Sequence, residues 1–298
     1  MTSVVGKSVR IDQLFAGGPT RSFEFFPPKS SDELVTLSST LHDLEALSPS
    51  FVSVTYRGGR ESRQRTFDLV TDIQRDGHLV TMAHLICVGH RRAEMREILE
   101  NYQSAGVANV MALGGDIPEE PDLVASDFTH AIDLVELALE IGNFSIGVAA
   151  HPLGHPRSVD LASDRRHLAA KLELAHFAVT QFFFELRDWT NLVGELDELG
   201  VTKPVLPGIM PVTTLSGVAR MAHMGAAVPP SLIERLENAQ YAGGASAVRA
   251  EGVAAAIELC QQLLDAGAPG LHFYTLNRST ATREIHEALY GSDGVRRP

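Results

Sequence analysis

Polar side chains recur at the ends of short apolar runs that have the character of buried β-strands. In chain order they are Glu24, Thr55, His84, Asp116, His151, Gln181 and Tyr274. Burying an isolated polar group in a strand costs free energy, so a series of this kind indicates a shared site. Carboxyl, imidazole, amide and phenol groups together can transfer protons and hydrogen-bond a small polar ligand.

Glu24 is the most informative of these residues because it lies within FEFFPP, residues 23–28, with phenylalanine on both sides. A carboxyl group among aromatic rings is desolvated, which disfavours its charged form. Such a group can hold a proton near neutral pH and serve as a general acid. A structural glutamate paired with a lysine or arginine fits the strand context equally well, so both interpretations stay open at this point.

The turn Gly114–Gly115–Asp116 follows the fourth apolar run. Glycine lets the backbone approach a ligand closely, and the aspartate then presents a carboxylate. The structural alternative is an ordinary helix entry, for which such residues are common. The sequence has neither a G-x-G-x-x-G fingerprint after a strand nor a G-x-x-x-x-G-K-[ST] loop, so any nucleotide must be bound by other loops.

Histidines in AAHPLGHP could suggest zinc, because His151 and His155 stand four residues apart. The intervening Pro152 and Gly154 deny them a common helical face, so we predict no metal site. His167 and His176 lie in a helical segment, where a surface or structural role is the simpler interpretation.

Eight apolar runs alternate with segments of helical period, which predicts parallel βα units and an α/β fold of the (β/α)8 TIM-barrel class. The expected strands are Ser22 to Phe26, Phe51 to Tyr56, Leu79 to Cys87, Ala108 to Leu113, Phe144 to Ala150, Phe177 to Phe184, Val205 to Ile209 and Gly270 to Leu276. The active site of such a barrel forms at the carboxyl ends of its strands, where the polar series lies.

Helical patterns connect these strands, beginning with the leucines from Leu34 to Leu47 after Ser30 and Ser31, which can cap the helix. Further patterns are Phe67 to Ile73, Met95 to Tyr102, Phe128 to Leu139, Leu168 to Leu174 and Leu186 to Leu199. Two extra helical stretches, Leu215 to Met224 and Leu232 to Asn238, precede a Gly243–Gly244 break and a long helix from Ser246 to Ala266. We expect an N-terminal extension (1–20), one barrel domain (21–290) and a fraying C-terminal tail (291–298).

Bulk properties exclude several classes of partner. The chain has 298 residues, a net charge of -12 and two cysteines, Cys87 and Cys260. The negative charge works against nucleic acid and anionic membranes as partners. Two distant cysteines cannot build a disulfide framework, and no leader or transmembrane-length apolar run is visible. We therefore expect a soluble cytoplasmic protein, and a homo-oligomer is compatible with the sequence.

Eight motifs in order make the chain similar to the methylenetetrahydrofolate reductases from about residue 21 to residue 290. They are FEFFPPKS, FVSVTYRGG, AHLIC, ALGGDIP, VAAHPLGHP, TQFFFE, PGIMPV and HFYTLNR, each ending an expected strand. The resemblance implies a barrel that reduces 5,10-methylenetetrahydrofolate to 5-methyltetrahydrofolate. It further implies that NADH or NADPH supplies the electrons and that FAD passes hydride to the bridging carbon of the reduced folate.

Site residues follow from the same resemblance, position by position. Glu24 resembles the acid that protonates the N10 side of the imidazolidine ring, which leaves an iminium cation at N5. Asp116 resembles the carboxylate beside flavin and pterin, whose charge favours that cation. Gln181, Tyr274 and Arg278 resemble the substrate-binding positions. The positions that line the family's FAD site are Thr55, His84, Asp116, Ala150, His151, His155, Asp164 and Lys171.

Four positions depart from the family pattern near the expected flavin. Gly114 stands where the family usually has arginine, His151 replaces a tyrosine, His167 an asparagine, and Leu215 a mobile phenylalanine. Losing the arginine removes a cation from a site that must hold a pyrophosphate. Since Glu24 and the folate positions are kept, we hypothesise that FAD binds weakly and that hydride passes directly from nicotinamide to the iminium carbon.

Three alternatives remain to be weighed against this interpretation. The first keeps FAD and a ping-pong cycle, with the same net reaction. The second is a non-catalytic folate-binding or regulatory barrel, which would have no need for a buried acid. The third is a barrel aldolase or lyase, but no strand carries the lysine that Schiff-base chemistry would need, because Lys29 and Lys203 lie outside the strand ends.

Overall fold

Eight parallel strands close into a barrel in which each strand pairs with the next along the chain and the last pairs with the first. This computed structural model describes residues 9–56, 60–115, 126–278 and 280–291. The strands are β1 (Thr20–Phe25), β2 (Phe51–Val54), β3 (Thr81–Ile86), β4 (Asn109–Leu113), β5 (Ser145–Ala150), β6 (Phe177–Phe182), β7 (Val205–Ile209) and β8 (Gly270–Tyr274). All eight expected strands are confirmed, and the predicted TIM barrel with them.

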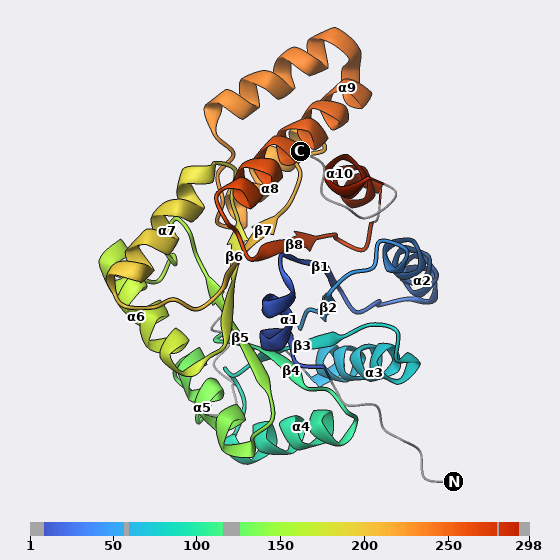
Figure 1. Cartoon of the computed structure of the whole chain (residues 1–298). Helices are drawn as coiled ribbons and strands as arrows, with labels where there is room; N and C mark the ends of the chain where they lie inside the picture. The colour runs from blue at the N-terminus through green and yellow to red at the C-terminus, as the bar shows by residue number, and fades with distance from the viewer. Residues whose placement is uncertain (1–8, 57–59, 116–125, 279, 292–298) are drawn as a thin grey trace.

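Helices surround the barrel and follow its strands in turn (Figure 1). They are α1 (Ile11–Leu14), a 3-10 turn η1 (Phe15–Gly17), α2 (Ser31–Glu45), α3 (Arg60–Asp76), α4 (Arg92–Ser104), α5 (Ala131–Ile141), α6 (Leu161–Leu174), α7 (Leu186–Glu198), α8 (Leu215–His223), α9 (Pro230–Asp265) and α10 (Thr280–Tyr290). Neither α1 nor α10 was predicted from the sequence pattern. Within the described ranges, no helix is long and apolar enough to cross a bilayer.

Alternation along β1 divides its residues between two environments. Phe23 and Phe25 are fully buried and pack in the core cluster that also contains Leu37 and Leu44 of α2. That helix begins as expected, because the Ser30 hydroxyl accepts a hydrogen bond from the backbone N–H of Glu33 at 3.2 Å. The phenylalanines therefore lie in the layer between barrel and helices, and the residues between them along the strand point inward.

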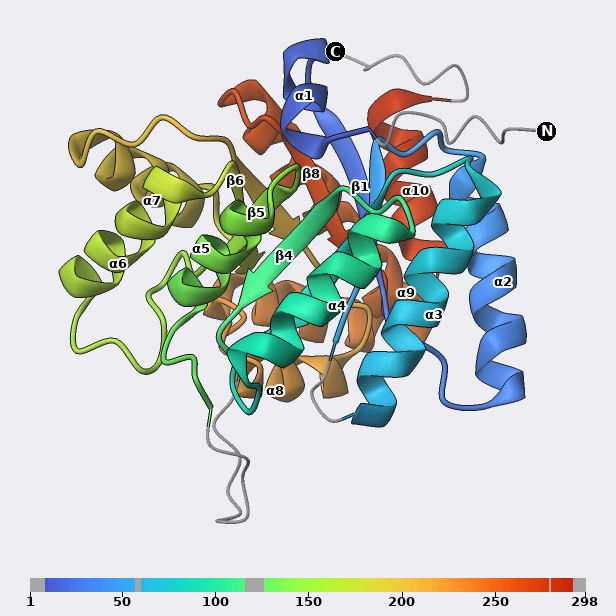
Figure 2. The same cartoon turned by 90° about the horizontal axis from the view of Figure 1, so that it is seen from below.

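The segment before β1 fills the amino-terminal end of the barrel. Ile11 of α1 is fully buried in a cluster with inward residues of the strands, including Phe51 and Met111. Asn109 fixes the segment, because its Oδ1 accepts from the Ile11 backbone N–H at 2.8 Å and its Nδ2 donates to the Val9 carbonyl at 3.0 Å. Figure 2 shows α1 at one end of the barrel and α8 toward the other. The carboxyl end of the barrel is thus left for a ligand.

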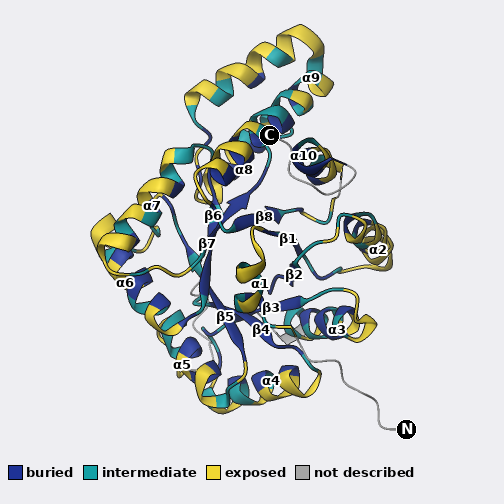
Figure 3. Ribbon diagram, in the orientation of Figure 1, coloured by how far each residue is buried: buried dark blue, intermediate teal, exposed yellow. Residues whose placement is uncertain are grey.

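Extra helices stand between β7 and β8, as predicted. Helix α8 is followed by α9, which is interrupted by non-helical backbone at Gly243 and Gly244. The chain reverses there, and Arg235 before the break pairs with Glu251 and Glu258 after it. The part before the break projects from the barrel and is largely exposed (Figures 1 and 3).

The second part of α9 packs tightly against the barrel at Gly252. A Cβ at this position would lie 1.8 Å from the Val212 carbonyl oxygen in the segment after β7. Only glycine allows the helix and that segment to approach so closely. This contact ties the extra helices to the rim on which the site is built.

Candidate active site

Glu24 points into the barrel interior from the carboxyl end of β1. Its Oε2 lies 3.4 Å from Nε2 of His272 on β8 and 3.5 Å from Nε2 of His84 on β3. The Glu24 side chain is only 9% exposed, and the His272 side chain is 1% exposed. Among the described residues the ion-pair partners of Glu24 are these two histidines, so a pairing with lysine or arginine is not supported there.

The surroundings of Glu24 differ from the expected wall of phenylalanine. Phe23 and Phe25 face outward, since successive side chains of a strand point to opposite faces. The burial of the carboxyl group comes instead from inward residues of neighbouring strands. Tyr274 is directly opposite Glu24 in the register of β1 and β8.

Burial controls the charge state of two groups that face Glu24. It lowers the pKa of His84, against the opposing effect of the Glu24 charge, so this imidazole is neutral at pH 7. Burial, and secondarily the Glu24 charge, raises the pKa of the Tyr274 phenol well above its ordinary value. Both groups therefore offer hydrogen bonds without carrying charge.

Tyr274 is held by a hydrogen bond that spans two strands. Its hydroxyl donates to the Thr180 carbonyl oxygen on β6 at 2.6 Å. The ring lies beside Gly208 of β7, where a Cβ would come within 2.6 Å of the ring carbon Cε2. The Thr180 hydroxyl also accepts from the Gly208 backbone N–H at 2.9 Å.

Gln181 lies at an irregularity in β6, where the register with β7 shifts between Val179 and Phe182. Its Nε2 donates to the Met224 carbonyl oxygen at 3.1 Å, and its Oε1 accepts from the Phe182 backbone N–H at 3.1 Å. A bulge changes the direction of a side chain at a strand end. The amide is thus placed between the barrel mouth and the residue that follows α8.

A second group of predicted residues gathers where the chain passes from β5 to α6. Buried Asp164 accepts from the His155 backbone N–H at 3.1 Å and from the Ser158 hydroxyl at 3.1 Å. Arg165, 3% exposed, donates to Asp164 at 2.8 Å and to the carbonyl oxygens of His151 and Pro152 at 2.9 and 2.6 Å. This network fixes the shape of the segment from 151 to 158.

The imidazoles of His151 and His155 meet edge to face, with ring centroids 4.6 Å apart. Burial, aided by His155, lowers the pKa of His151 to about 4, so the ring is neutral at pH 7. Lys171 donates to the Ala149 carbonyl oxygen at 3.0 Å, and burial lowers the pKa of its ammonium group. In the described part of the chain no group of three or more His, Cys, Asp or Glu side chains is arranged to hold a metal ion.

The remaining predicted positions fall in three situations. Thr55 is buried, and neither its Oγ1 nor the Nε2 of His84 has a hydrogen-bond partner within the described chain. Ala150 is buried at the end of β5, whereas Arg278 is exposed in the turn after β8. Asp116 lies outside the described residues. Unpaired buried polar atoms of this kind fit the polar edge of a bound ring.

Near the expected flavin site, three cationic side chains of the described residues already donate hydrogen bonds to protein oxygens. Lys171 and Arg165 have the partners given above, and Arg157 donates to the Gly115 carbonyl oxygen at 3.1 Å. Gly114 has no side chain, and a Cβ there would lie 3.9 Å from Nη2 of Arg157. His167 is exposed on α6 and Leu215 is half-buried at the start of α8. The described residues thus fit a polar ring edge but offer poor support for a tightly held diphosphate.

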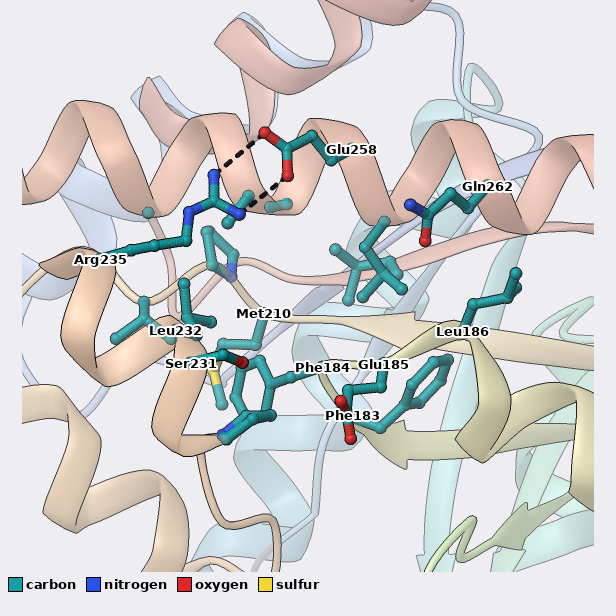
Figure 4. Close-up of a pocket in the computed structure, with 18 of the residues that line it drawn as sticks. Phe183, Phe184, Glu185, Leu186, Met210, Ser231, Leu232, Arg235, Glu258 and Gln262 are labelled. Carbon is teal, nitrogen blue, oxygen red and sulfur yellow. Dashed lines mark hydrogen bonds and ion pairs between the residues drawn. The ribbon is translucent and has the colours of Figure 1, made fainter.

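A cavity of about 430 Å³ lies away from the predicted residues (Figure 4). It is bounded by the segment after β6, the end of β7 and α9, and none of the predicted site residues lines it. Arg235 at its edge is paired with Glu258, as the dashed lines of Figure 4 show. This cavity therefore lies outside the group of inward polar residues.

Two residues of the site were missed by the sequence reasoning. His272 and Ser22 face inward, and the Ser22 hydroxyl lies 2.8 Å from Nδ1 of His272. A signal existed, because each precedes a predicted site residue by two positions on the same strand and therefore shares its face. The prediction was limited to polar residues at the strand ends and therefore left out these inward residues two positions earlier.

Comparison with known proteins gives a consistent assignment. The sequence profile of the family described as methylenetetrahydrofolate reductase matches residues 10–290. The 5,10-methylenetetrahydrofolate reductase of Pectobacterium carotovorum is 34% identical over 283 residues, covering 92% of this chain and 90% of the relative. The Escherichia coli protein of the same name is 32% identical over 280 residues, with 92% and 90% covered.

Two further similarities support narrower conclusions. A Caenorhabditis elegans protein named probable methylenetetrahydrofolate reductase (NADPH) is 33% identical over 280 residues, covering 90% of this chain and 42% of that protein. A solved Clostridium thermocellum protein that binds two copies of 5-methyl-5,6,7,8-tetrahydrofolic acid has a TM-score of 0.65 at 10% identity, with 93% and 97% covered. That likeness supports the fold alone. From the profile match and these relatives, the chain belongs to the methylenetetrahydrofolate reductase family.

Proposed function

We propose that this protein reduces 5,10-methylenetetrahydrofolate to 5-methyltetrahydrofolate with a reduced nicotinamide, and that Glu24 is its general acid. The observation that carries the proposal is the buried Glu24 carboxyl group, which lies among inward polar groups at the carboxyl end of the barrel. Membership of the reductase family and the names of the relatives support the substrate and the reaction.

The substrate carries a CH2 bridge between N5 and N10, and the bridge must open before reduction. Glu24 donates its proton to N10 as the bond between N10 and the bridging carbon breaks, which leaves a cationic iminium at N5. Hydride then adds to that carbon and completes the methyl group. General acid catalysis of this kind contributes about 10²–10⁴-fold to the rate. One proton and one hydride are consumed in each turnover.

Residues around Glu24 are assigned to orient the folate. Gln181 and Tyr274 lie on neighbouring parts of the mouth, linked through Thr180, and supply an amide and a phenol for the pterin ring. Arg278, exposed after β8, is assigned to the more distal part of the substrate. The carboxylate of Asp116 would favour the iminium cation by its negative charge, although this residue lies outside the described part of the chain.

The donor of hydride is proposed to be NADH or NADPH itself. A resident FAD must remain bound through every turnover, whereas a nicotinamide substrate binds and leaves, so only FAD needs a site of very high affinity. Such a site does not fit the residues here, because Arg157 and Lys171 already donate to main-chain carbonyl oxygens and Gly114 has no side chain. The edge-to-face pair of His151 and His155 instead lines a segment suited to transient binding.

The test is an assay of NADH and NADPH oxidation with methylenetetrahydrofolate, with and without added FAD. We expect turnover without FAD, no flavin absorbance in the purified protein, and intersecting double-reciprocal lines, because both substrates must be bound together. Flavin bands and parallel lines would show a ping-pong cycle instead. The variant Glu24→Gln should lose turnover but keep binding of 5-methyltetrahydrofolate, and an active Glu24→Gln protein would refute the acid assignment.

A further inference from the structure

A hydrogen-bonded chain runs from Glu24 into the barrel interior and ends at the backbone. His272 places Nε2 toward Oε2 of Glu24 at 3.4 Å and Nδ1 toward the Ser22 hydroxyl at 2.8 Å. The Ser22 hydroxyl in turn donates to the Leu271 carbonyl oxygen at 3.2 Å. Ser22 and His272 are fully buried and directly opposite each other in the register of β1 and β8.

The hydrogen bond from Ser22 to Leu271 favours one set of proton positions along this chain. A carbonyl oxygen can only accept, so the hydrogen of the Ser22 hydroxyl points toward Leu271. The Ser22 oxygen must then accept, and His272 donates to it through Nδ1–H. Either a neutral His272 presents the lone pair of Nε2 to a protonated Glu24, or a charged His272 presents Nε2–H to the Glu24 carboxylate.

Both arrangements keep one transferable proton between Nε2 of His272 and Oε2 of Glu24. Loss of one proton to solvent would give a third arrangement, in which neutral His272 carries its hydrogen on Nε2 and Glu24 is a carboxylate without a proton to give. In that arrangement the Ser22 hydroxyl would have to turn and donate to Nδ1, and its buried hydrogen bond to the Leu271 carbonyl oxygen would be lost. Ser22 therefore disfavours the form of the pair that lacks the transferable proton.

Other titratable groups that face Glu24 do not serve this purpose. His84 is kept neutral by burial, which lowers its pKa, and its Nε2 is 3.5 Å from Oε2. Burial raises the pKa of the Tyr274 phenol, whose hydrogen is given to the Thr180 carbonyl oxygen. On β2 the residue paired with Glu24 is Ser53, which does not titrate in the ordinary pH range.

We propose that Ser22 and His272 are positioning residues that keep the acid of this enzyme loaded with its proton. The inference rests on the proposed role of Glu24. When Glu24 has given its proton to N10, the pair has lost one proton and regains it from solvent after the product leaves. If the pair reloads through His272, the Nε2–H bond breaks, the Oε2–H bond forms and the imidazolium returns to its neutral form.

The experiment compares pH profiles of kcat/KM for the wild type, Ser22→Ala and His272→Gln. In Ser22→Ala the form without a transferable proton is no longer disfavoured. The fall of kcat/KM at high pH, the basic limb of the profile, should therefore move to lower pH by about one unit. A displacement of one unit is about a tenfold loss on that limb, with little change at acidic pH. KM for the folate should stay close to the wild-type value, because both side chains are fully buried.

The matched control is Ser145→Ala, which removes another fully buried strand serine. Ser145 lies at the amino-terminal end of β5, where its hydroxyl accepts from the Asp12 backbone N–H at 3.0 Å, away from Glu24. Its pH profile should match that of the wild type. The variant Ser22→Thr keeps the hydroxyl and should restore the basic limb.

The outcomes separate this inference from the proposed function. If Glu24→Gln is inactive while Ser22→Ala and His272→Gln keep the wild-type profile, or lose the same factor at every pH, the relay is refuted and the acid stands. An active Glu24→Gln protein refutes both. Circular dichroism and binding of 5-methyltetrahydrofolate establish that each variant is folded, and His272→Gln gives the same decision should Ser22→Ala fail to fold.

Discussion

The phenol of Tyr274 on β8 reaches past β7 and donates a hydrogen bond of 2.6 Å to the main-chain carbonyl oxygen of Thr180 on β6. Gly208 lies on the strand between them and leaves room for the ring. The contact joins three neighbouring strands at the barrel mouth. It also holds the ring of Tyr274 beside the inward groups around Glu24.

Adding one methyl group at Gly208 should disturb this contact. In Gly208→Ala the new Cβ would lie 2.3 Å from the Thr180 carbonyl oxygen and 2.6 Å from the Tyr274 ring, so strand or ring must move. We expect a loss of about 1–3 kcal/mol in the free energy of unfolding, as for other overpacked sites. The value of kcat/KM should fall as well, because the phenol is displaced. Denaturant unfolding and steady-state assays measure the two effects.

Gly194→Ala is the control for that substitution. Gly194 lies within α7, and a Cβ there meets nothing within 4 Å. Alanine in a helix interior should stabilise the protein by roughly 0.5–1 kcal/mol and leave kcat/KM unchanged. Equal kinetics for the two alanine variants would contradict a role for the Tyr274 position in the site.

Removing Arg165 should destabilise the segment between β5 and α6. The Arg165→Leu variant removes the cation that pairs with the buried Asp164 carboxylate and with Glu195, and it frees the carbonyl oxygens of His151 and Pro152. Loss of one partner of a buried ion pair costs about 3–5 kcal/mol. Thermal or denaturant unfolding gives the difference, and KM for the nicotinamide should rise because the segment loses its fixed shape.

An exposed ion pair serves as the comparison for Arg165. Arg187, with a side chain 71% exposed, pairs with Glu185 at 2.5 Å. Arg187→Leu should leave the free energy of unfolding almost unchanged, because an ion pair in solvent contributes little to stability. A similar cost for Arg165→Leu and Arg187→Leu would show that burial of the Asp164 pair adds nothing.

Acidification should destabilise the protein through His286. This side chain is buried on α10, and burial, together with the Arg21 charge, lowers its pKa to about 4. In the unfolded chain its pKa is about 6.5, so below that pH the unfolded state binds more protons than the folded state. The free energy of unfolding should therefore fall as the pH drops from about 6.5 to about 4, and hold steady above this window.

Substitution of His286 tests the assignment of that slope. His286→Gln should reduce the slope of the free energy of unfolding against pH by an amount that corresponds to at most one bound proton. Urea titrations between pH 4 and pH 8 measure this slope. The buried imidazole of His151 acts in the same direction, so part of the slope will remain. A slope unaffected by His286→Gln would rule out this origin.

Gln181 should contribute mainly to substrate binding. Its amide has two protein partners, Met224 and Phe182, which hold it in place and leave one N–H and one oxygen lone pair for a pterin. In Gln181→Leu both bonds are lost, and we expect KM for methylenetetrahydrofolate to rise with a smaller change in kcat. A fall in kcat at constant KM would place the residue in the chemical step instead. Initial rates at varied folate concentration decide between the two.

Much of the barrel could be predicted from the sequence because its signals are local. Each buried strand is an apolar run bounded by turns, and each helix repeats its apolar residues every three to four positions. The Gly243–Gly244 break between helices was predicted for the same reason. Helix α1 was not, because its four residues are too few to show a period.

The polar series was also readable along the chain, since a charged residue inside an apolar run is unusual wherever it occurs. The direction in which each side chain points was not. Glu24 was expected among phenylalanines because they are its neighbours in sequence, yet strand alternation places Phe23 and Phe25 on the opposite face.

Only closure of the barrel decided which groups surround the acid. His84 comes from β3 and His272 from β8, 60 residues after and 248 residues after Glu24 along the chain. No local pattern relates residues so far apart, because their approach depends on how the eight strands pair in register. The sequence by itself thus determined the elements and the kinds of chemical groups available, and the tertiary structure determined which of those groups lie next to the acid.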